Sequence, residues 1–295
     1  YALDAEGASM TAFLKSQRRL ATEYCGEIDP LDLEEYRRRS GFQALQTCLQ
    51  SMHARETDGA VPFYEKILAE IEASGLRGRG GAGFPVAAKW RAVRASGDTT
   101  KYVICNGDEG DPGAFMDRMM LESYPFRVIE GMLIAALAVN AQEGIFYIRA
   151  EYPLAVERVN RAIALCEKAG LLGKTVAGTS FSFRIRVVQG AGAFICGEET
   201  ALIASVEGRR GTPTLRPPYP AERGVFGCPT LVNNTETLAL VPWIMRNGAA
   251  AFAALGTPKS TGTKVFSLAG KVVRGGLIEV PMGMSISAIV DEIGG

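Results

Sequence analysis

Short apolar runs and longer segments of helical periodicity alternate through the middle of the chain. Residues 101–106, 144–149 and 183–188 are rich in Val, Ile and aromatic residues and lead into polar residues or glycine, which is typical of buried strands. Residues 125–140 and 152–169 carry apolar residues at helical spacing. This alternation predicts crossover connections and an α/β fold with a mainly parallel sheet. In such sheets ligands bind outside the carboxyl ends of the strands, where the polar clusters of this sequence fall.

The part of the chain before the first predicted strand has a helical pattern. Residues 10–50 carry several helical signals, among them Asp29 as a predicted cap and Pro30 at the first position of a helix. Residues 62–71 have apolar positions at helical spacing, and a glycine-rich loop follows them. We expect a further helix after this loop, carrying Lys89.

The pattern of predicted elements changes from residue 256 onward. Two apolar runs, 264–270 and 276–281, predict a pair of strands joined by a glycine-containing turn, and a short helix is expected over 285–292. We expect this part to be the start of a small separate domain that continues beyond residue 295. The sequence is therefore divided into an N-terminal helical segment (1–60), a ligand-binding α/β domain (61–255) and the start of a further domain (256–295).

Composition and charge exclude several classes of function. The chain has 295 residues, is 47% hydrophobic and 22% charged, and has 32 basic and 32 acidic residues, so its formal net charge is zero. Without a basic stripe a nucleic-acid partner is not expected. The longest apolar run, near residues 131–139, is too short to span a bilayer, and the first residues are not expected to act as a signal peptide. We therefore expect a cytoplasmic protein that does not insert into a membrane.

The cysteines and the histidine predict no metal site. The six cysteines form no C-x-x-C pair and no other spacing typical of metal ligands, so free and mostly buried thiols are expected. His53 is the only histidine and lies in a polar connector, which excludes chemistry built on several histidines. No metal held by cysteine or histidine is therefore expected within residues 1–295.

The strongest signal for a ligand is a glycine-rich loop. Five glycines fall between Gly75 and Gly83, together with two arginines, and Phe84 and Lys89 follow. Glycine lacks a Cβ, so this backbone can bring its N–H groups against a ligand, and Lys89 can add a positive charge. The loop lacks the Gly-Lys-Ser/Thr ending of a Walker loop and the usual dinucleotide spacing. A flexible linker is the alternative, but a phosphate-bearing cofactor is the favoured interpretation.

Two acidic clusters follow predicted strands. Residues 106–113 hold Asn106 and three carboxylates, which could bind a divalent cation, hydrogen-bond a heterocycle and sugar hydroxyls, or form a plain acidic turn. Residues 190–200 place glycines, Glu198 and Glu199 at a strand-to-helix junction, where a helix dipole alone could also explain the acids.

Two further segments could contact a ligand. Residues 209–220 form a basic loop stiffened by prolines that could lie along a ligand. Residues 233–237 precede an apolar helix and supply several donors for phosphate, although a helix cap is an equal alternative. Together, five clusters at separate strand ends are most simply explained by one extended, phosphorylated ligand.

Four of these segments, in this order, resemble a known family. Residues 74–85, 105–113, 190–200 and 232–237 are similar to the flavin-bearing, NADH-oxidising subunit of respiratory complex I and to its soluble relatives in NAD-linked or electron-bifurcating hydrogenases and formate dehydrogenases. The resemblance covers about residues 60–295. It implies a Rossmann-like, mainly parallel sheet with helices on both faces, an N-terminal helical segment, and the start of a ubiquitin-like β-grasp domain after residue 256.

The resemblance also implies roles for individual residues. Fourteen positions would bind the FMN cofactor: Gly78, Arg79, Gly80, Gly81, Lys89, Asn106, Asp108, Glu109, Phe194, Gly197, Glu198, Asn233, Asn234 and Thr237. Five would bind NAD: Phe84, Asp111, Glu199, Arg216 and Tyr219. The chain departs from the complex I pattern where Asp111 replaces glutamate, Phe194 tyrosine, Arg216 lysine and Tyr219 phenylalanine, and where Ala92 replaces an aromatic residue.

The activity implied by the resemblance is that of a diaphorase subunit. A hydride would pass between NAD(H) and FMN, and single electrons would then go to iron–sulfur clusters, with no catalytic side chain. The Glu199 carboxylate would favour NAD over NADP. A [4Fe–4S] cluster is expected only in a region after residue 295. The expected partners are a small [2Fe–2S] thioredoxin-like subunit and an iron–sulfur, hydrogenase or formate dehydrogenase subunit.

Two other functions remain open from the sequence. A structural or assembly subunit without flavin and with a degenerate nucleotide site is one alternative, given Ala92 and the other departures. A nucleotide-hydrolysing enzyme is the weaker one, because the Walker lysine and hydroxyl pair is missing.

Overall fold

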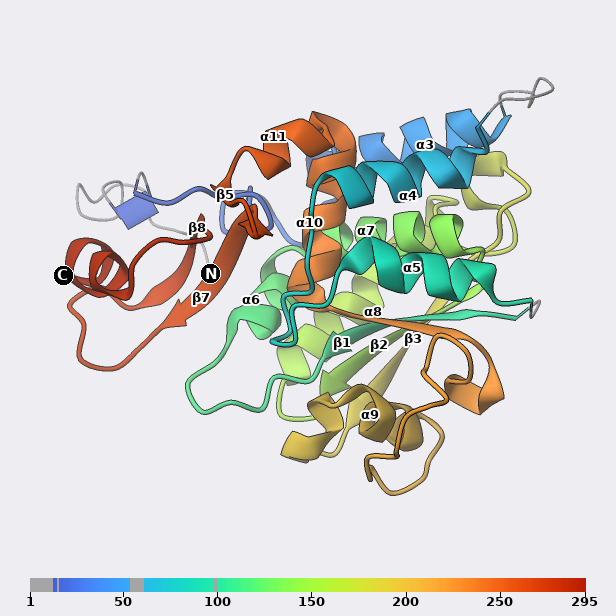
Figure 1. Ribbon diagram of the computed structural model, residues 1–295. Coiled ribbons are helices and arrows are strands. Elements are labelled where there is room, and N and C mark those ends of the chain that lie inside the picture. Colours follow the sequence, from blue (N-terminus) through green and yellow to red (C-terminus); the bar gives the residue numbers. More distant parts are fainter. Residues whose placement is uncertain (1–12, 15, 54–60, 98–99) are drawn as a thin grey trace.

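A parallel sheet of four strands forms the centre of the structure. The computed structural model describes residues 13–14, 16–53, 61–97 and 100–295 (Figure 1). The strands are β1 (Tyr102–Gly107), β2 (Glu143–Arg149), β3 (Arg184–Gly190) and β4 (Thr230–Asn234), in the order β3-β2-β1-β4. All three strand pairs are parallel, which confirms the predicted α/β fold. β4 was not predicted as a strand, because its last residues were interpreted only as the approach to a helix.

The sheet is covered by helices on both faces. On one face Val103, Cys105 and Phe146 pack into the larger hydrophobic core beneath the long helices. On the other face Ile104 and Ile145 pack with residues of the short helix α9 (Glu199–Val206). Successive residues of β1 thus point to opposite layers, both apolar, which explains why β1 and β2 are nearly continuous apolar runs. β3 lies at the edge of the sheet, and its Arg184 and Arg186 are exposed.

The helices above the sheet surround one fully buried helix. Every residue of α7 (Pro125–Val139) is buried, and it contacts helices that arrive from both ends of the chain. The helices and helical turns of this layer and of the loops are α2 (Leu33–Arg38), α3 (Gln43–His53), α4 (Phe63–Ala73), α5 (Val86–Ala95), α6 (Met116–Ser123), α8 (Pro153–Lys168), α10 (Thr235–Asn247), α11 (Ala249–Ala253), η1 (Val176–Gly178), η2 (Phe194–Gly197) and η3 (Val225–Gly227). Figure 1 shows α9 below the sheet and α3, α4, α5 and α7 above it.

The N-terminal segment differs in detail from its prediction. α2 begins at Leu33, and Asp32 caps it by accepting a hydrogen bond from the Glu35 N–H at 2.9 Å. Asp29 instead accepts from the Leu31 N–H, so Asp29 and Pro30 belong to the turn before the helix. Residues 21–27 also form turns, while residues 10–12 and residue 15 of the predicted helical region lie outside the described residues. The prediction was wrong here because two aspartates three residues apart can both cap, and only one of them has the helix after it.

The C-terminal part forms small antiparallel strand pairs. β5 (Gly256–Thr257) pairs with β6 (Ser260–Thr261), and β7 (Thr263–Leu268) pairs with β8 (Gly276–Pro281). The two longer predicted strands are therefore confirmed. The predicted short helix is a π-helical segment, η4 (Ala288–Gly294). Leu268, Ile278 and Val280 share a separate small apolar cluster with Phe13 and Ile293.

The close approach of α7 and α10 leads to a first prediction. A Cβ at Gly131 would lie 2.0 Å from the backbone oxygen of Leu238, so Gly131→Ala must push the two buried helices apart. We expect this variant to lower the free energy of unfolding by about 3 kcal/mol, measured by urea denaturation. Gly97→Ala is the matched control, because a Cβ there meets nothing within 4 Å. Equal stability of the two variants would contradict this account of the helix contact.

Candidate functional site

A cavity of about 720 Å³ opens at the carboxyl ends of β1 and β4. Thirteen of the nineteen predicted site residues line it: Gly78, Gly80, Phe84, Lys89, Asn106, Gly197, Glu198, Glu199, Arg216, Tyr219, Asn233, Asn234 and Thr237. They come from the glycine loop, α5, the ends of two strands, and the turns before α9 and β4. The structure therefore brings together segments that are about 160 residues apart, as expected at the carboxyl edge of a parallel sheet.

The glycine loop is held in place from both of its sides. The Gly78 N–H donates to the Phe84 oxygen at 2.9 Å, which closes the loop on itself. Gly80 lies against β4, because a Cβ there would be 3.1 Å from the Asn234 Cβ. A Cβ added at residue 80 would therefore press against Asn234, the last residue of β4. The absence of side chains leaves backbone as the surface that the loop presents to the cavity.

Arg79 anchors this loop to the C-terminal strands. Its buried guanidinium donates to the backbone oxygens of Thr263 at 3.0 Å and Thr261 at 2.6 Å, and its backbone N–H donates to Thr237 Oγ1 at 2.9 Å. Arg79 does not line the cavity, and neither does the exposed Gly81. The structure gives the Arg79 side chain a role in holding the loop, which the sequence did not suggest.

Asn106 connects the end of β1 to the turn before α9. Its Nδ2 donates to the Gly197 oxygen at 2.9 Å, and its Oδ1 accepts from the Asp108 N–H at 3.0 Å. Both functional groups of the amide are therefore fixed within the protein. This places Gly197 and Asn106 side by side in the cavity wall.

Asp108 lies behind this wall in a poorly solvated position. Its side chain is 2% exposed, and Arg149 faces it at a distance, with the Arg149 Nε 3.8 Å from Asp108 Oδ1. Among the described residues none donates a hydrogen bond to this oxygen. Burial raises the pKa of Asp108 to about 6, although Arg149 acts in the opposite direction. A weakly compensated carboxylate next to a ligand cavity is typical of a functional site.

Three predicted residues lie away from the cavity. Glu109 caps α6, since its carboxylate accepts from the backbone N–H groups of Met116 at 2.8 Å and Arg118 at 3.2 Å. Burial raises the pKa of Glu109 in spite of these hydrogen bonds. Asp111 and Phe194 are exposed, and neither is part of the cavity wall. Their assignments stay predictions.

The two asparagines at the junction of β4 and α10 are held by residues that the sequence analysis missed. Asn233 Oδ1 accepts from the indole N–H of the buried Trp90 at 2.9 Å. Asn234 caps α10 through the Glu236 N–H at 2.9 Å, and its Nδ2 donates to Asp117 Oδ2 at 2.7 Å. Helical spacing from Val86 could have placed Trp90 on the buried face of α5, whereas nothing local marks Asp117.

A chain of charges crosses the other end of the cavity. Lys89 Nζ lies 2.9 Å from Glu199 Oε2, and Arg216 Nη1 lies 2.7 Å from Glu199 Oε1. Glu198 caps α9 through the N–H groups of Thr200 and Ala201 and lies 3.7 Å from Arg216. Glu198 thus lies at the helix N-terminus, in agreement with the helix-dipole alternative, while Glu199 bridges two cations. The carboxylate of Glu199 is therefore already compensated.

The two ends of the cavity offer different chemistry. One end presents backbone of the glycine loop, Asn234 and the first turn of α10, an arrangement suited to a phosphate. The other presents the charged bridge and two half-exposed aromatic side chains, Phe84 and Tyr219, suited to a flat ring and a ribose. An extended ligand with a phosphate at one end and a planar heterocycle at the other fits this wall. Because Gly80 lines the cavity, a Cβ at this position would take space from such a ligand.

Comparison with known proteins gives consistent matches. Residues 71–243 match the family described as the Nuo51 FMN-binding domain. The NADP-reducing hydrogenase subunit HndC of Solidesulfovibrio fructosivorans is 48% identical over 95% of this chain and 55% of its own length. An NADH-quinone oxidoreductase subunit of Rhizobium meliloti is 42% identical over 89% of this chain and 60% of its own length.

A solved structure agrees with these relatives. The crystal structure of an NAD⁺-reducing [NiFe]-hydrogenase in the H₂-reduced state superposes with a TM-score of 0.77 at 37% identity, covering 95% of this chain and 43% of that chain. The chain spans about half the length of the curated relatives it matches. Within the described residues, no helix combines the length and the apolar character needed to cross a membrane.

The buried carboxyl of Asp108 leads to a second prediction. Its pKa is raised from 3.8 to about 6 in the folded protein, so the folded state binds the proton more tightly than the unfolded state does. Its contribution to the free energy of unfolding therefore decreases as the pH rises through this window. We expect Asp108→Asn to flatten this decrease by up to about 3 kcal/mol, since one pKa unit corresponds to about 1.4 kcal/mol. Denaturation curves of both proteins across the window measure it, and identical pH profiles would refute the assignment.

Proposed function

Because the chain belongs to the Nuo51 FMN-binding domain family, we propose that it is the diaphorase part of a multisubunit oxidoreductase, in which a hydride passes between NAD(H) and FMN. The observation that carries this proposal is the cavity into which the glycine loop, the end of β1, the turn before α9 and the asparagines of β4 all open. When bound, FMN supplies two-electron exchange with a nicotinamide and one-electron exchange with iron–sulfur clusters.

The phosphate end of FMN would lie at the junction of β4 and α10. Asn234 and Thr237 line the cavity there, and Gly80 offers backbone opposite them. The first turn of a helix favours an anion through its dipole and its backbone N–H groups. Asn106 and Gly197 would hold the ring end, because they form the neighbouring part of the wall.

The nicotinamide dinucleotide would bind at the charged end. Phe84 and Tyr219 are each 53% exposed at the cavity and offer apolar faces for stacking. Glu199 would accept hydrogen bonds from ribose hydroxyls. The chain's own residues would thus bind, orient and shield two rings, and no side chain has to move a proton in the hydride step.

The wider complex is proposed from the proteins to which the chain is similar. These relatives are subunits of hydrogenases and of NADH-quinone oxidoreductases, and this chain spans about half of their length. We propose a [4Fe–4S] cluster in a region after residue 295, with residues 256–295 as the start of a β-grasp domain before it. The proposed partners are a small [2Fe–2S] thioredoxin-like subunit and an iron–sulfur, hydrogenase or formate dehydrogenase subunit, and the proposed location is the cytoplasm.

The flavin proposal has a direct test. The full-length protein that contains this chain, reconstituted with FMN, is expected to be yellow and to lose its visible flavin absorbance when NADH is added anaerobically. Gly80→Ala is expected to weaken FMN binding about tenfold, because the added Cβ meets Asn234. Gly97→Ala, which changes an open position, serves as the control. A folded wild-type protein that takes up no FMN would favour the alternative of an assembly subunit without flavin.

A further prediction concerns the choice of dinucleotide. In Glu199→Gln the ammonium of Lys89 and the guanidinium of Arg216 lose their shared counter-charge, so the cavity gains positive charge where a 2′-phosphate would approach. We expect the ratio of kcat/KM for NADPH to that for NADH to rise by about tenfold or more. Glu143→Gln removes the same charge at the start of β2, the opposite end of the sheet, and should leave the ratio unchanged. An unaltered ratio in Glu199→Gln would remove the role given to Glu199.

A further inference from the structure

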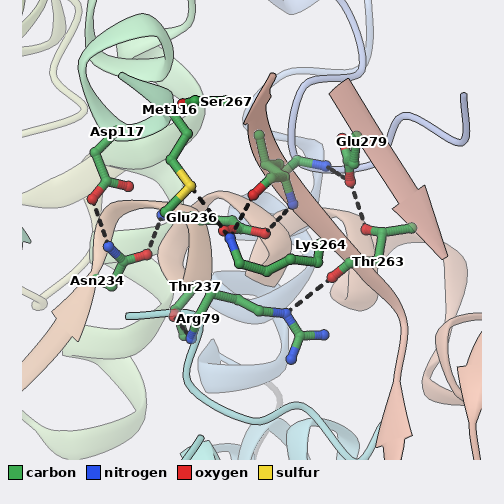
Figure 2. A network of polar contacts seen from close by, with 12 residues as sticks. Arg79, Met116, Asp117, Asn234, Glu236, Thr237, Thr263, Lys264, Ser267 and Glu279 are labelled. Atoms are coloured by element: carbon green, nitrogen blue, oxygen red, sulfur yellow. Dashed lines mark hydrogen bonds and ion pairs between the residues drawn. The ribbon is translucent and has the colours of Figure 1, made fainter. Parts of the chain in front are cut away.

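A buried ion pair joins the C-terminal hairpin to the first turn of α10. Lys264 of β7 forms this pair with Glu236, whose side chain is fully buried (Figure 2). Glu236 Oε1 also accepts from the Val265 N–H at 2.8 Å, and Lys264 Nζ also contacts Met116 Sδ at 3.3 Å. The carboxylate is therefore held by one ammonium and one backbone N–H, both from the same strand.

Glu236 lies directly behind the part of the cavity suited to phosphate. Its own N–H donates to Asn234 Oδ1, and the next residue, Thr237, lines the cavity with Asn234. Figure 2 shows Glu236 between Asn234 and Lys264, with Arg79 below them. An uncompensated carboxylate in this turn would oppose any anion bound at the helix N-terminus, because charges interact strongly where water is excluded.

Other carboxyl groups lie close to this turn. Asp117 is buried, and its Oδ2 accepts from the amide of Asn234, which lines the cavity. Burial and the neighbouring carboxylates of Glu109 and Glu236 raise the pKa of Asp117 well above its usual range, whereas Lys264 acts in the opposite direction. Arg79 also acts on Glu236, but its guanidinium is already engaged by backbone oxygens. Within the described part of the chain, Lys264 is the cation in direct contact with Glu236.

We propose that Lys264 is a positioning residue for the phosphate of the flavin: by neutralising Glu236 it allows the first turn of α10 to accept an anion. The C-terminal hairpin is then part of the electrostatics of the cofactor site, although Lys264 does not line the cavity. This inference rests on the proposed FMN binding. A purely structural ion pair would hold the hairpin on α10 and would affect any ligand of the cavity alike.

Riboflavin separates these two roles, because it has the ring and the ribityl chain of FMN but no phosphate. Dissociation constants of both compounds are measured by flavin fluorescence on the full-length apoprotein and on Lys264→Met. We expect Lys264→Met to weaken FMN binding at least about tenfold and riboflavin binding less than about twofold. Lys264→Arg keeps the charge and is expected to stay within about threefold of the wild type for both compounds.

Two further variants keep the proposal open to refutation if Lys264→Met does not fold. Glu236→Gln/Lys264→Met removes both charges and should restore FMN binding to within about threefold of the wild type. Glu236→Gln alone keeps the lysine and should bind FMN more tightly than the wild type, with riboflavin unchanged.

The outcomes discriminate between the proposals. If Lys264→Met loses FMN and riboflavin equally, or if Glu236→Gln does not change FMN binding, the ion pair is structural and the inference is overturned. If the folded wild-type protein binds neither flavin, it is the proposed function that fails.

Discussion

The junction of β4 and α10 is the constraint on which the site depends. At Asn234 the strand ends and the helix begins, and one amide side chain caps the helix, binds Asp117 and lies against Gly80 of the glycine loop. The parallel register sets Asn234 opposite Asn106 of β1, so the loop after β1 and the first turn of α10 start from adjacent strand ends. A shift at this junction would move the helix N-terminus and the loop packed on it together.

Compensated carboxylates surround the cavity at both ends. Glu199 bridges Lys89 and Arg216 at the rim, whereas Glu236 is buried against Lys264 behind the wall. A buried carboxylate costs free energy unless a cation or several donors accompany it. In both cases the partner comes from another element, so these pairs tie α5 and the loop before β4 to α9, and β7 to α10. The electrostatics of the site are thus inseparable from the contacts that hold its walls in place.

The sequence predicted much of the sheet and of the cavity wall. β1, β2 and β3 follow from short apolar runs, of which the central β1 and β2 are largely buried and the edge strand β3 is partly exposed. The glycine loop follows from the five glycines between Gly75 and Gly83. The residues that line the cavity were predicted from four ordered motifs that resemble a known family. The resemblance also implies a mainly parallel sheet, and ligands of such sheets bind at the carboxyl ends of the strands. Arg79 and Glu109 show the limit of this approach, since each belongs to a motif while its side chain serves the packing around the cavity.

By itself the sequence determined the α/β class, the alternation of strands and helices that makes the sheet parallel, and the polar segments that follow the strands. It could do so because periodicity and glycine content are local properties of the chain. The tertiary structure alone decided that Trp90 holds Asn233, that Asp117 holds Asn234 and that Lys264 faces Glu236. These pairs join residues 143, 117 and 28 positions apart. Their partners are selected by burial and charge within the folded protein, where no local pattern in the chain can indicate them.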